Sequence, residues 1–157
     1  MRRPSVCAAA ALTVACLSLI VLTAGCGSAT ARPVPYIDLT RQVGPLEFAR
    51  ITISLCKDRN KLVEILERNN PGRTIRLPPI DFSRRVAYLI ATGPRSSTGY
   101  DLRIVRVSDQ GGSILIVVHE RTPRLGDPVT ARVTYPFRLI TLPRGSKPVK
   151  LKWPGRP

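Results

Sequence analysis

The chain has few residues that can carry catalytic or metal chemistry. It contains one histidine, His119, and only ten Asp and Glu residues in 157 positions. A Ser–His–Asp arrangement would depend on that single base, and no Gly-x-Ser-x-Gly turn is present to hold a nucleophile. The four cysteines and one histidine also make a multi-ligand zinc site an unfavourable interpretation. We therefore predict that the protein is not an enzyme and carries no metal or cofactor.

Aromatic residues are scarce as well, at 5% of the chain, whereas hydrophobic residues make up 43%. This composition is too apolar for a disordered polar chain, and it lacks the glycine repeat of collagen and the long apolar runs of a multi-pass membrane protein. The length suits one domain of ordinary size after a targeting segment is removed.

The N-terminus has the pattern of a secretory signal. It begins with Met-Arg-Arg-Pro-Ser, continues with an uncharged stretch from Val6 to Ala24, and reaches Gly25-Cys26-Gly27. A basic start, an apolar middle and small residues before a cleavage site are typical of a segment that is removed on export. Residues 1–25 are therefore predicted to be a signal peptide.

The run Leu22-Thr23-Ala24-Gly25-Cys26 resembles the lipobox of bacterial lipoproteins, although Thr23 stands where leucine is usual. The resemblance implies that the thiol of Cys26 is joined to a diacylglycerol and that Cys26 becomes the new N-terminus. A single membrane-spanning anchor and a freely secreted form stay open as alternatives. All three place the rest of the chain outside the cytoplasmic membrane.

Cys56 is the one cysteine beyond this region, so the mature domain is not expected to form an internal disulfide. It ends an apolar strand pattern, which predicts a small core residue. Residues 26–46 are rich in Ala, Pro, Thr and Gly and are predicted to be a flexible tether. Within them, residues 36–39 alternate and could pair as an extra strand.

The domain proper is predicted over residues 47–153, with a tail at 154–157. Residues 51, 53 and 55 are apolar and alternate with polar ones, the period of a half-buried strand. Asp58 suits a helix N-cap, and apolar residues at helical spacing continue to about Arg68. Asn69-Asn70-Pro71-Gly72 ends this short helix, which we interpret as a cover over a sheet.

Strand patterns fill the remainder of the chain. Alternation predicts strands over 86–90, 100–104, 129–135 and 149–153, a turn at 109–112, and a continuation from 137 to 142 beyond Pro136. Residues 114–118 are continuously apolar, which predicts a strand buried on both faces with His119 packed in the core. Six or seven strands and one short helix predict a mostly-β domain, a sandwich or half-open roll.

Several short segments occur in a fixed order: Asp81-Phe82-Ser83, Ser97-Thr98-Gly99-Tyr100, Glu120-Arg121-Thr122-Pro123, Gly126-Asp127, Val133-Thr134-Tyr135-Pro136-Phe137 and Pro148-Val149-Lys150-Leu151. In this order they resemble the C-terminal domain family named after PrcB, a subunit of a bacterial surface protease complex. The family usually has Thr-Gly-Gly-Tyr where this chain has one glycine, and Arg95 adds a charge to the preceding loop. The resemblance implies an accessory protein that joins or stabilises a surface protease and is not itself a protease.

Two interpretations of Thr98-Gly99-Tyr100 stay open. One is a structural motif, in which Gly99 takes a positive φ in a tight turn and Tyr100 covers the core. The other is a partner-binding loop, with contacts predicted at Arg95, Ser97, Thr98, Gly99, Tyr100, Pro123, Gly126 and Asp127. A Thr-Gly-aromatic loop between strands is also similar to that of chagasin-type protease inhibitors, so an inhibitor is an alternative function.

Positive charge exceeds negative charge, with 25 Lys and Arg against 10 Asp and Glu and a net charge of +15. Five of the cations occupy the polar phase of predicted strands and would form a basic face if those strands were neighbours: Arg50, Arg103, Arg132, Lys150 and Lys152. Anionic lipid head groups or acidic envelope polymers suit such a face better than nucleic acid, which an exported domain rarely meets. The alternative is that the charge only keeps the domain soluble.

The leading hypothesis from the sequence is a lipid-anchored binding module on the outer face of the bacterial membrane or envelope. Its expected partner is an envelope protein, such as a protease. The inhibitor and the basic module for anionic polymers are the alternatives.

Overall fold

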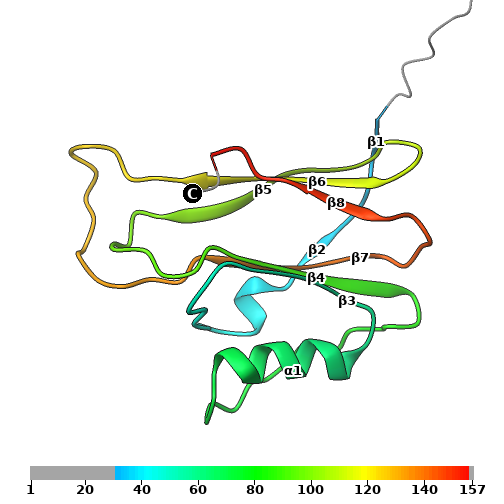
Figure 1. The fold of residues 1–157 in the computed structure, drawn as a ribbon, viewed down its shortest axis with the longest axis horizontal. Helices are drawn as coiled ribbons and strands as arrows, with labels where there is room; N and C mark the ends of the chain where they lie inside the picture. The colour runs from blue at the N-terminus through cyan, green and yellow to red at the C-terminus, as the bar shows by residue number, and fades with distance from the viewer. Residues whose placement is uncertain (1–30, 156–157) are drawn as a thin grey trace, which may run out of the picture.

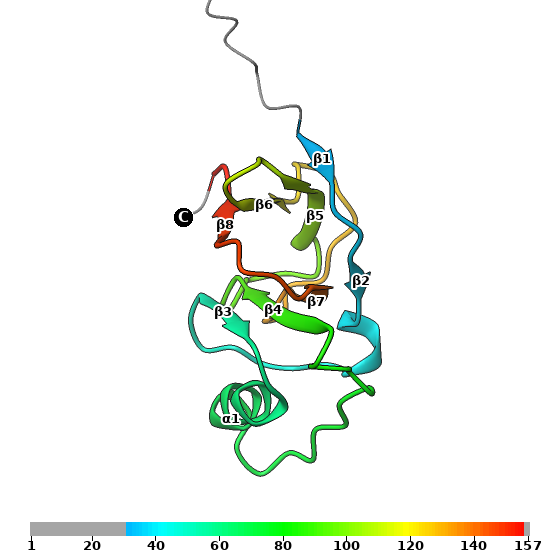
Figure 2. The same cartoon turned by 90° about the vertical axis from the view of Figure 1, so that its right-hand side faces the viewer.

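The computed structural model describes residues 31–155. They form two four-stranded sheets packed face to face, with one helix against the outer side of the second sheet (Figures 1 and 2). The strand order is β1-β5-β6-β8 in the first sheet, called sheet A, and β2-β7-β4-β3 in the second, called sheet B. The predicted signal peptide and Cys26 lie outside the described residues.

Neighbouring strands are antiparallel in both sheets, except for the parallel pair of β6 and β8. Sheet A consists of β1 (Arg32–Pro33), β5 (Asp101–Asp109), β6 (Ile114–Arg121) and β8 (Val149–Lys152). Sheet B consists of β2 (Ile37–Asp38), β3 (Thr52–Cys56), β4 (Arg85–Ala91) and β7 (Phe137–Pro143). The predicted mostly-β fold with one short helix is confirmed, and of the two predicted architectures, sandwich or half-open roll, the described residues form the sandwich. They contain eight strands where six or seven were predicted, and β2 forms within the patch that could pair as an extra strand.

The helix α1 (Arg59–Asn69) begins where the sequence predicts. The side chain of Asp58 accepts a hydrogen bond from the backbone N–H of Lys61 at 2.8 Å, which satisfies one of the free donors of the first turn. At the other end, Asn70 departs from helical geometry and its N–H bonds to the carbonyl of Glu67. The predicted helix and its N-cap are therefore confirmed.

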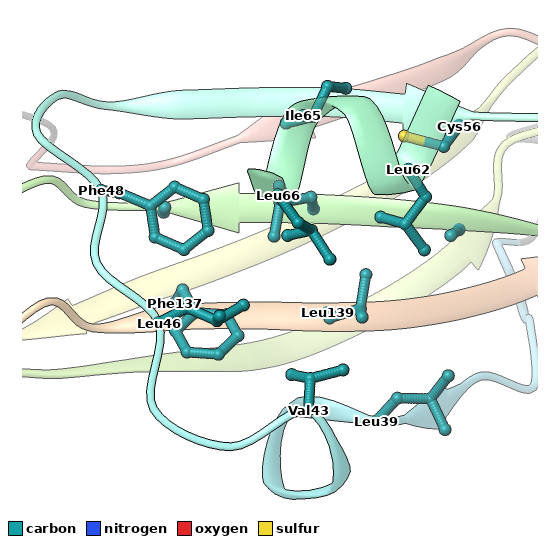
Figure 3. Close-up of a cluster of buried hydrophobic side chains, with 13 residues drawn as sticks. Leu39, Val43, Leu46, Phe48, Cys56, Leu62, Ile65, Leu66, Phe137 and Leu139 are labelled. Atoms are coloured by element: carbon teal, nitrogen blue, oxygen red, sulfur yellow. The ribbon is translucent and has the colours of Figure 1, made fainter. Parts of the chain in front are cut away.

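The buried face of α1 packs on sheet B and forms the helix-side core (Figure 3). Leu62, Ile65 and Leu66 of the helix lie against Leu89 and Leu139 of the two central strands. The helix-side core also contains Cys56, which is fully buried as predicted, and the tilted ring pair of Phe48 and Phe137, whose centroids are 5.5 Å apart. Burial of apolar surface stabilises a fold by about 25 cal/mol per Å², so the packing of α1 on sheet B contributes to the stability of the domain.

Strand β4 contributes to two cores because both of its faces are covered. Ala87, Leu89 and Ala91 face the helix-side core, whereas Val86, Tyr88 and Ile90 face the inter-sheet core between sheets A and B. All six are buried, which explains why this stretch contains no charged residue. The inter-sheet core is completed by residues of the other strands and by the buried Trp153: Leu102, Val107, Ile116, Val118, Ile140 and Leu142.

The packed part of the chain begins before the predicted boundary at residue 47. Between Arg32 and Leu46, a segment predicted as tether, β1 and β2 add an edge strand to each sheet, and a 3-10 turn (Thr40–Gln42) follows. Leu39, Val43 and Leu46 are buried in the helix-side core. The sequence does not predict this packing, because the few apolar residues of the segment are spaced too irregularly to show a strand or helix period.

The prediction that the strand at 114–118 is buried on both faces is wrong for one face. Ile116 and Val118 are buried in the inter-sheet core, but Leu115 and Val117 are only half-buried and His119 is exposed. These three residues lie on the outer face of sheet A, which no helix within residues 31–155 covers (Figure 2). His119 is therefore a surface residue and not the packed core residue that the sequence suggested.

The predicted strand at 129–135 does not form. Residues 122–136 cross from β6 in sheet A to β7 in sheet B, and their one bridge is between Arg95 and Thr134. A segment that changes sheets cannot pair along its length with either of them. The alternating valines are consequently exposed, Val129 by 41% and Val133 by 60% of their surface.

Candidate functional site

Two loops meet at one end of the sandwich, called the loop end (Figure 1). One loop joins β4 to β5 and the other, residues 122–136, joins β6 to β7. Arg95 and Thr134 exchange backbone hydrogen bonds of 2.8 and 2.9 Å, and Thr98 exchanges bonds of 3.1 and 3.0 Å with Thr130. The hydroxyl of Thr134 also donates to the carbonyl of Ser97 at 2.7 Å. These bonds hold both loops as one surface.

Gly99 is required by close packing between the loops. A Cβ atom at this position would lie 2.5 Å from the side chain of Val129 and 2.6 Å from that of Pro123, so a larger residue would push the loops apart. The expected positive φ at Gly99 is wrong, whereas Gly93, at the start of the same loop, does have a φ of 76°. Gly99 is therefore needed because the two loops approach each other closely at this position, and not because the turn requires a positive φ.

Arg95 belongs to the interior of the loop end. Its guanidinium forms two hydrogen bonds with the carboxylate of Glu120, one of them of 3.0 Å, and the two side chains are only 15% and 7% exposed. The guanidinium carbon also lies 6.0 Å from the ring centre of Tyr100, within reach of a cation–π contact. Because Arg95 follows β4 and Glu120 lies in β6, this ion pair joins the two sheets.

The tip of the 122–136 loop is a turn that presents Leu125 to solvent. Asp127 holds the turn: its N–H donates to the carbonyl of Arg124 at 3.0 Å, and its carboxylate accepts from the N–H of Arg124 and from the guanidinium of Arg121. The N–H of Arg124, together with the Arg121 side chain, lowers the pKa of Asp127 below its ordinary value. Gly126 provides the positive φ, 91°, that the turn needs. Leu125 is left fully exposed.

The predicted contact residues therefore divide into two groups. Arg95 and Ser97 are largely buried, and Gly99 and Tyr100 are half-buried within the loop packing. Thr98 and Gly126 are exposed, whereas Pro123 and Asp127 are half-buried and support the turn. The sequence did not predict that three apolar residues of the 122–136 loop would be exposed: Leu125, Val129 and Val133.

A cationic hollow of about 550 Å³ lies beside this turn, on the outer side of sheet A. Arg103, His119, Arg121 and Arg124 line it, together with the acidic residues Glu120 and Asp127. Each of these carboxylates already has an arginine partner, Arg95 and Arg121 respectively. Among the described residues, none of the ion pairs involves Arg124, whose guanidinium is exposed. The hollow thus favours a negatively charged partner surface.

The five cations of the predicted basic face do not all lie together. Arg103, Lys150 and Lys152 lie on the outer face of sheet A, where strand pairing places Lys150 beside Leu115 and Lys152 beside Val117. Arg106, opposite Val117 on β5, joins them. The structure places Arg50 just before β3 of sheet B and Arg132 within the 122–136 loop.

Nucleophilic and metal-binding groups are sparse over residues 31–155. Burial raises the pKa of the Cys56 thiol, so it is held in its neutral form. No set of three or more His, Cys, Asp or Glu side chains in this range is placed to hold a metal ion. The same residues include no helix that is long and apolar enough to span a bilayer.

The comparison with protein families finds one match within this architecture. Residues 87–143 match the model of the family described as PrcB C-terminal. The match runs from β4 to the end of β7 and so includes both loops of the loop end. This confirms the predicted family resemblance over the central part of the stretch from 81 to 153. Neither the curated proteins nor the solved structures include a match to this chain.

Proposed function

We propose that this chain is a non-enzymatic binding module that docks on another protein through its loop end. The observation that carries the proposal is the exposure of Leu125, Val129 and Val133 on a loop that hydrogen bonds hold in place. Exposed apolar side chains grouped on a supported loop are typical of interaction sites. A pre-ordered loop also loses less conformational entropy when it binds.

The cationic hollow beside the turn extends this surface and indicates the chemistry of the partner. Arg103, Arg121 and Arg124 line this concave region. Arg103 pairs with Asp101 and Arg121 with Asp127, so Arg124 is the cation that an anionic group of the partner would meet unpaired among the described residues. A partner that offers an apolar patch bordered by Asp or Glu side chains would match both parts of the loop end. A protease of the cell envelope is the partner class that the family resemblance implies.

We further propose that the module is exported and held on the outer face of the membrane by a lipid on Cys26. The support is the lipobox-like run Leu22–Cys26 behind a basic, apolar N-terminus. Metabolic labelling with an alkyne fatty acid should mark the native chain and not Cys26→Ser. Equal labelling of both chains would contradict the anchor without affecting the proposal for the loop end.

The geometry favours docking through the 122–136 loop over a chagasin-like inhibitor. An inhibitor would have to insert Thr98-Gly99-Tyr100 into a protease. Gly99 is packed against Pro123 and Val129, and Tyr100 is half-buried beside Arg95. Little of this motif is available for insertion.

Photo-cross-linking in intact cells tests the docking proposal. A photoreactive amino acid at Leu125 should capture one defined protein. The same amino acid at Val105, an exposed aliphatic on the β5 bulge away from the loop end, serves as the matched position. Capture should be lost in Val133→Asp and kept in Val105→Asp, because these two valines are similarly exposed. The same set of adducts from both positions, or no adduct from Leu125 under several growth conditions, would overturn the proposal.

A further inference from the structure

A second concave site lies at the opposite end of the sandwich from the loop end. It is a cleft of about 520 Å³ where the two sheets separate, close to the turn between β5 and β6 and to the connection between β7 and β8. Both connections lie on the right of Figure 1, with the loop end on the left. The volume falls within the range of about 300–1,000 Å³ that is typical of small-molecule sites.

The interior of the cleft is apolar and continuous with the inter-sheet core. Its lining includes Val34, Leu55, Val86, Ile114, Leu142 and Val149, which come from both sheets. Val86 and Leu142 are buried at its base, whereas the other four are only half-buried. An apolar chain that entered between the sheets would remove these four side chains from water.

The mouth of the cleft is cationic. Lys57, Arg144 and Lys147 line it, against the single carboxylate of Asp109, which pairs with Lys147. The guanidinium of Arg144 is fixed by hydrogen bonds to the carbonyls of Lys57 and Phe82, at 3.0 and 2.6 Å. Neither Arg144 nor Lys57 takes part in an ion pair among the described residues. An anionic group at the mouth would therefore meet unneutralised positive charge.

The cleft also lies at the end of the domain where the chain enters from its N-terminal region. Strand β1 pairs with Ser108 and Asp109, and Val34, the next residue after β1, lines the cleft. Cys26 precedes Arg32 by six residues, a span of at most about 20 Å when fully extended. If Cys26 carries the proposed lipid, the mouth is held close to the membrane surface.

We infer that this cleft binds the acyl chain of an anionic amphiphile, with the chain between the two sheets and the head group beside Lys57 and Arg144. The shared chemistry is a carboxylate or phosphate on a hydrocarbon chain. A fatty acid and an anionic phospholipid are the two sources of such a molecule. The site is separate from the loop end, and its membrane source depends on the proposed anchor.

Photoaffinity labelling of the full chain in phosphatidylcholine nanodiscs tests this inference. One arm adds a fatty acid with a diazirine in its chain, and a second places the diazirine in phosphatidylglycerol. A third places it in phosphatidylcholine as the neutral control. Peptide mapping should find adducts on the segments that contain Val34, Leu142 and Val149 in the first arm, and in the second if the membrane supplies the ligand. Labelling there by phosphatidylcholine at equal strength would contradict a role for the anionic head.

Charge reversal at the mouth supplies the matched variants. Lys57→Glu leaves Arg144 and the pair of Lys147 with Asp109 in place, and should reduce cleft labelling about tenfold. Lys150→Glu makes the same change of charge on the outer face of sheet A, and should leave labelling within about twofold. Unchanged labelling in Lys57→Glu, or adducts found only outside the cleft, would overturn the inference. Because the fatty-acid arm requires neither the anchor nor the loop end, its failure is distinguishable from failure of the proposed function.

Discussion

The two sheets of this domain have the same number of strands but different surroundings. Sheet B lies between α1 and sheet A, so β4 buries every residue from Val86 to Ala91. Within the part of the chain that the structure describes, sheet A is covered on one side only, and its central strand β6 buries Ile116 and Val118 while Leu115 and Val117 remain half-buried. Sheet B, which is covered on both faces, supplies residues to both cores, whereas the open face of sheet A carries exposed charged residues.

This difference explains where the charge lies. An antiparallel sheet tolerates water on one face, so its outward positions can be polar. Arg103, Arg106, Lys150 and Lys152 occupy such positions on sheet A. The corresponding side of sheet B is covered by α1 and lined by Leu89 and Leu139. The folded chain thus places these cations on the outer face of sheet A, where water can solvate them.

The largest predicted effect is a loss of stability when side chains of sheet B are shortened. Leu89→Ala and Ile90→Ala remove neighbouring side chains that point into different cores, and each should lower the free energy of unfolding by about 2–5 kcal/mol. Urea denaturation measures both losses. If either variant lost less than about 1 kcal/mol, that side of β4 would not be packed as described.

The core of sheet B is also the part that sequence pattern predicts best. The Asp58 cap and the spacing of Leu62, Ile65 and Leu66 locate α1 to within a residue, because both signals are local. The alternation of apolar residues likewise locates β3 and the first half of β5. The hydrophobic pattern does not show which face of a sheet is packed against another element. The continuous apolar run in β6 predicts burial on both faces, although no element of the described residues covers the outer face of sheet A.

The loop end could be predicted only in part, because its contacts depend on topology. Val129 and Val133 alternate like strand residues, and nothing local shows that their segment crosses between sheets. The pairing of Arg95 with Glu120 joins positions 25 residues apart in different sheets. A recognisable motif did indicate that Gly99 matters, but its reason, the approach of Pro123, requires the folded loops.

The next largest effect concerns the ion pair that links the sheets. Glu120→Ala leaves the guanidinium of Arg95 largely buried without its carboxylate, which should cost about 3 kcal/mol of unfolding free energy. The double variant Arg95→Met, Glu120→Leu removes both charges and should be more stable than Glu120→Ala. A double-mutant cycle of Arg95→Met, Glu120→Leu and the double variant, measured by urea denaturation, gives the coupling between the two side chains. Additive losses of unfolding free energy would contradict a coupled pair.

A smaller effect is expected on the open face of sheet A. Leu115→Ala deletes a half-buried side chain that no second layer covers, so the loss should be about 1 kcal/mol or less. Ile116→Ala, one residue further along β6, should cost at least twice as much because that side chain is fully buried. Equal losses at the two positions would indicate that another part of the protein covers the outer face of sheet A.

The smallest effect is a pH dependence at the turn that joins β5 and β6. A hydrogen bond from Lys147, with another from the N–H of Gly111, lowers the pKa of Asp109. Since the folded chain has the lower pKa, this stabilisation is present above the unfolded value of about 4 and is lost as the pH falls through the folded value. Asp109→Asn removes the titrating group, so its melting temperature should fall less between pH 6 and pH 3 than that of the native chain. Glu67→Gln makes the same change in net charge at an exposed carboxylate that takes part in no ion pair among the described residues, and serves as the control. Parallel melting curves for Asp109→Asn and the native chain would show that Asp109 does not contribute.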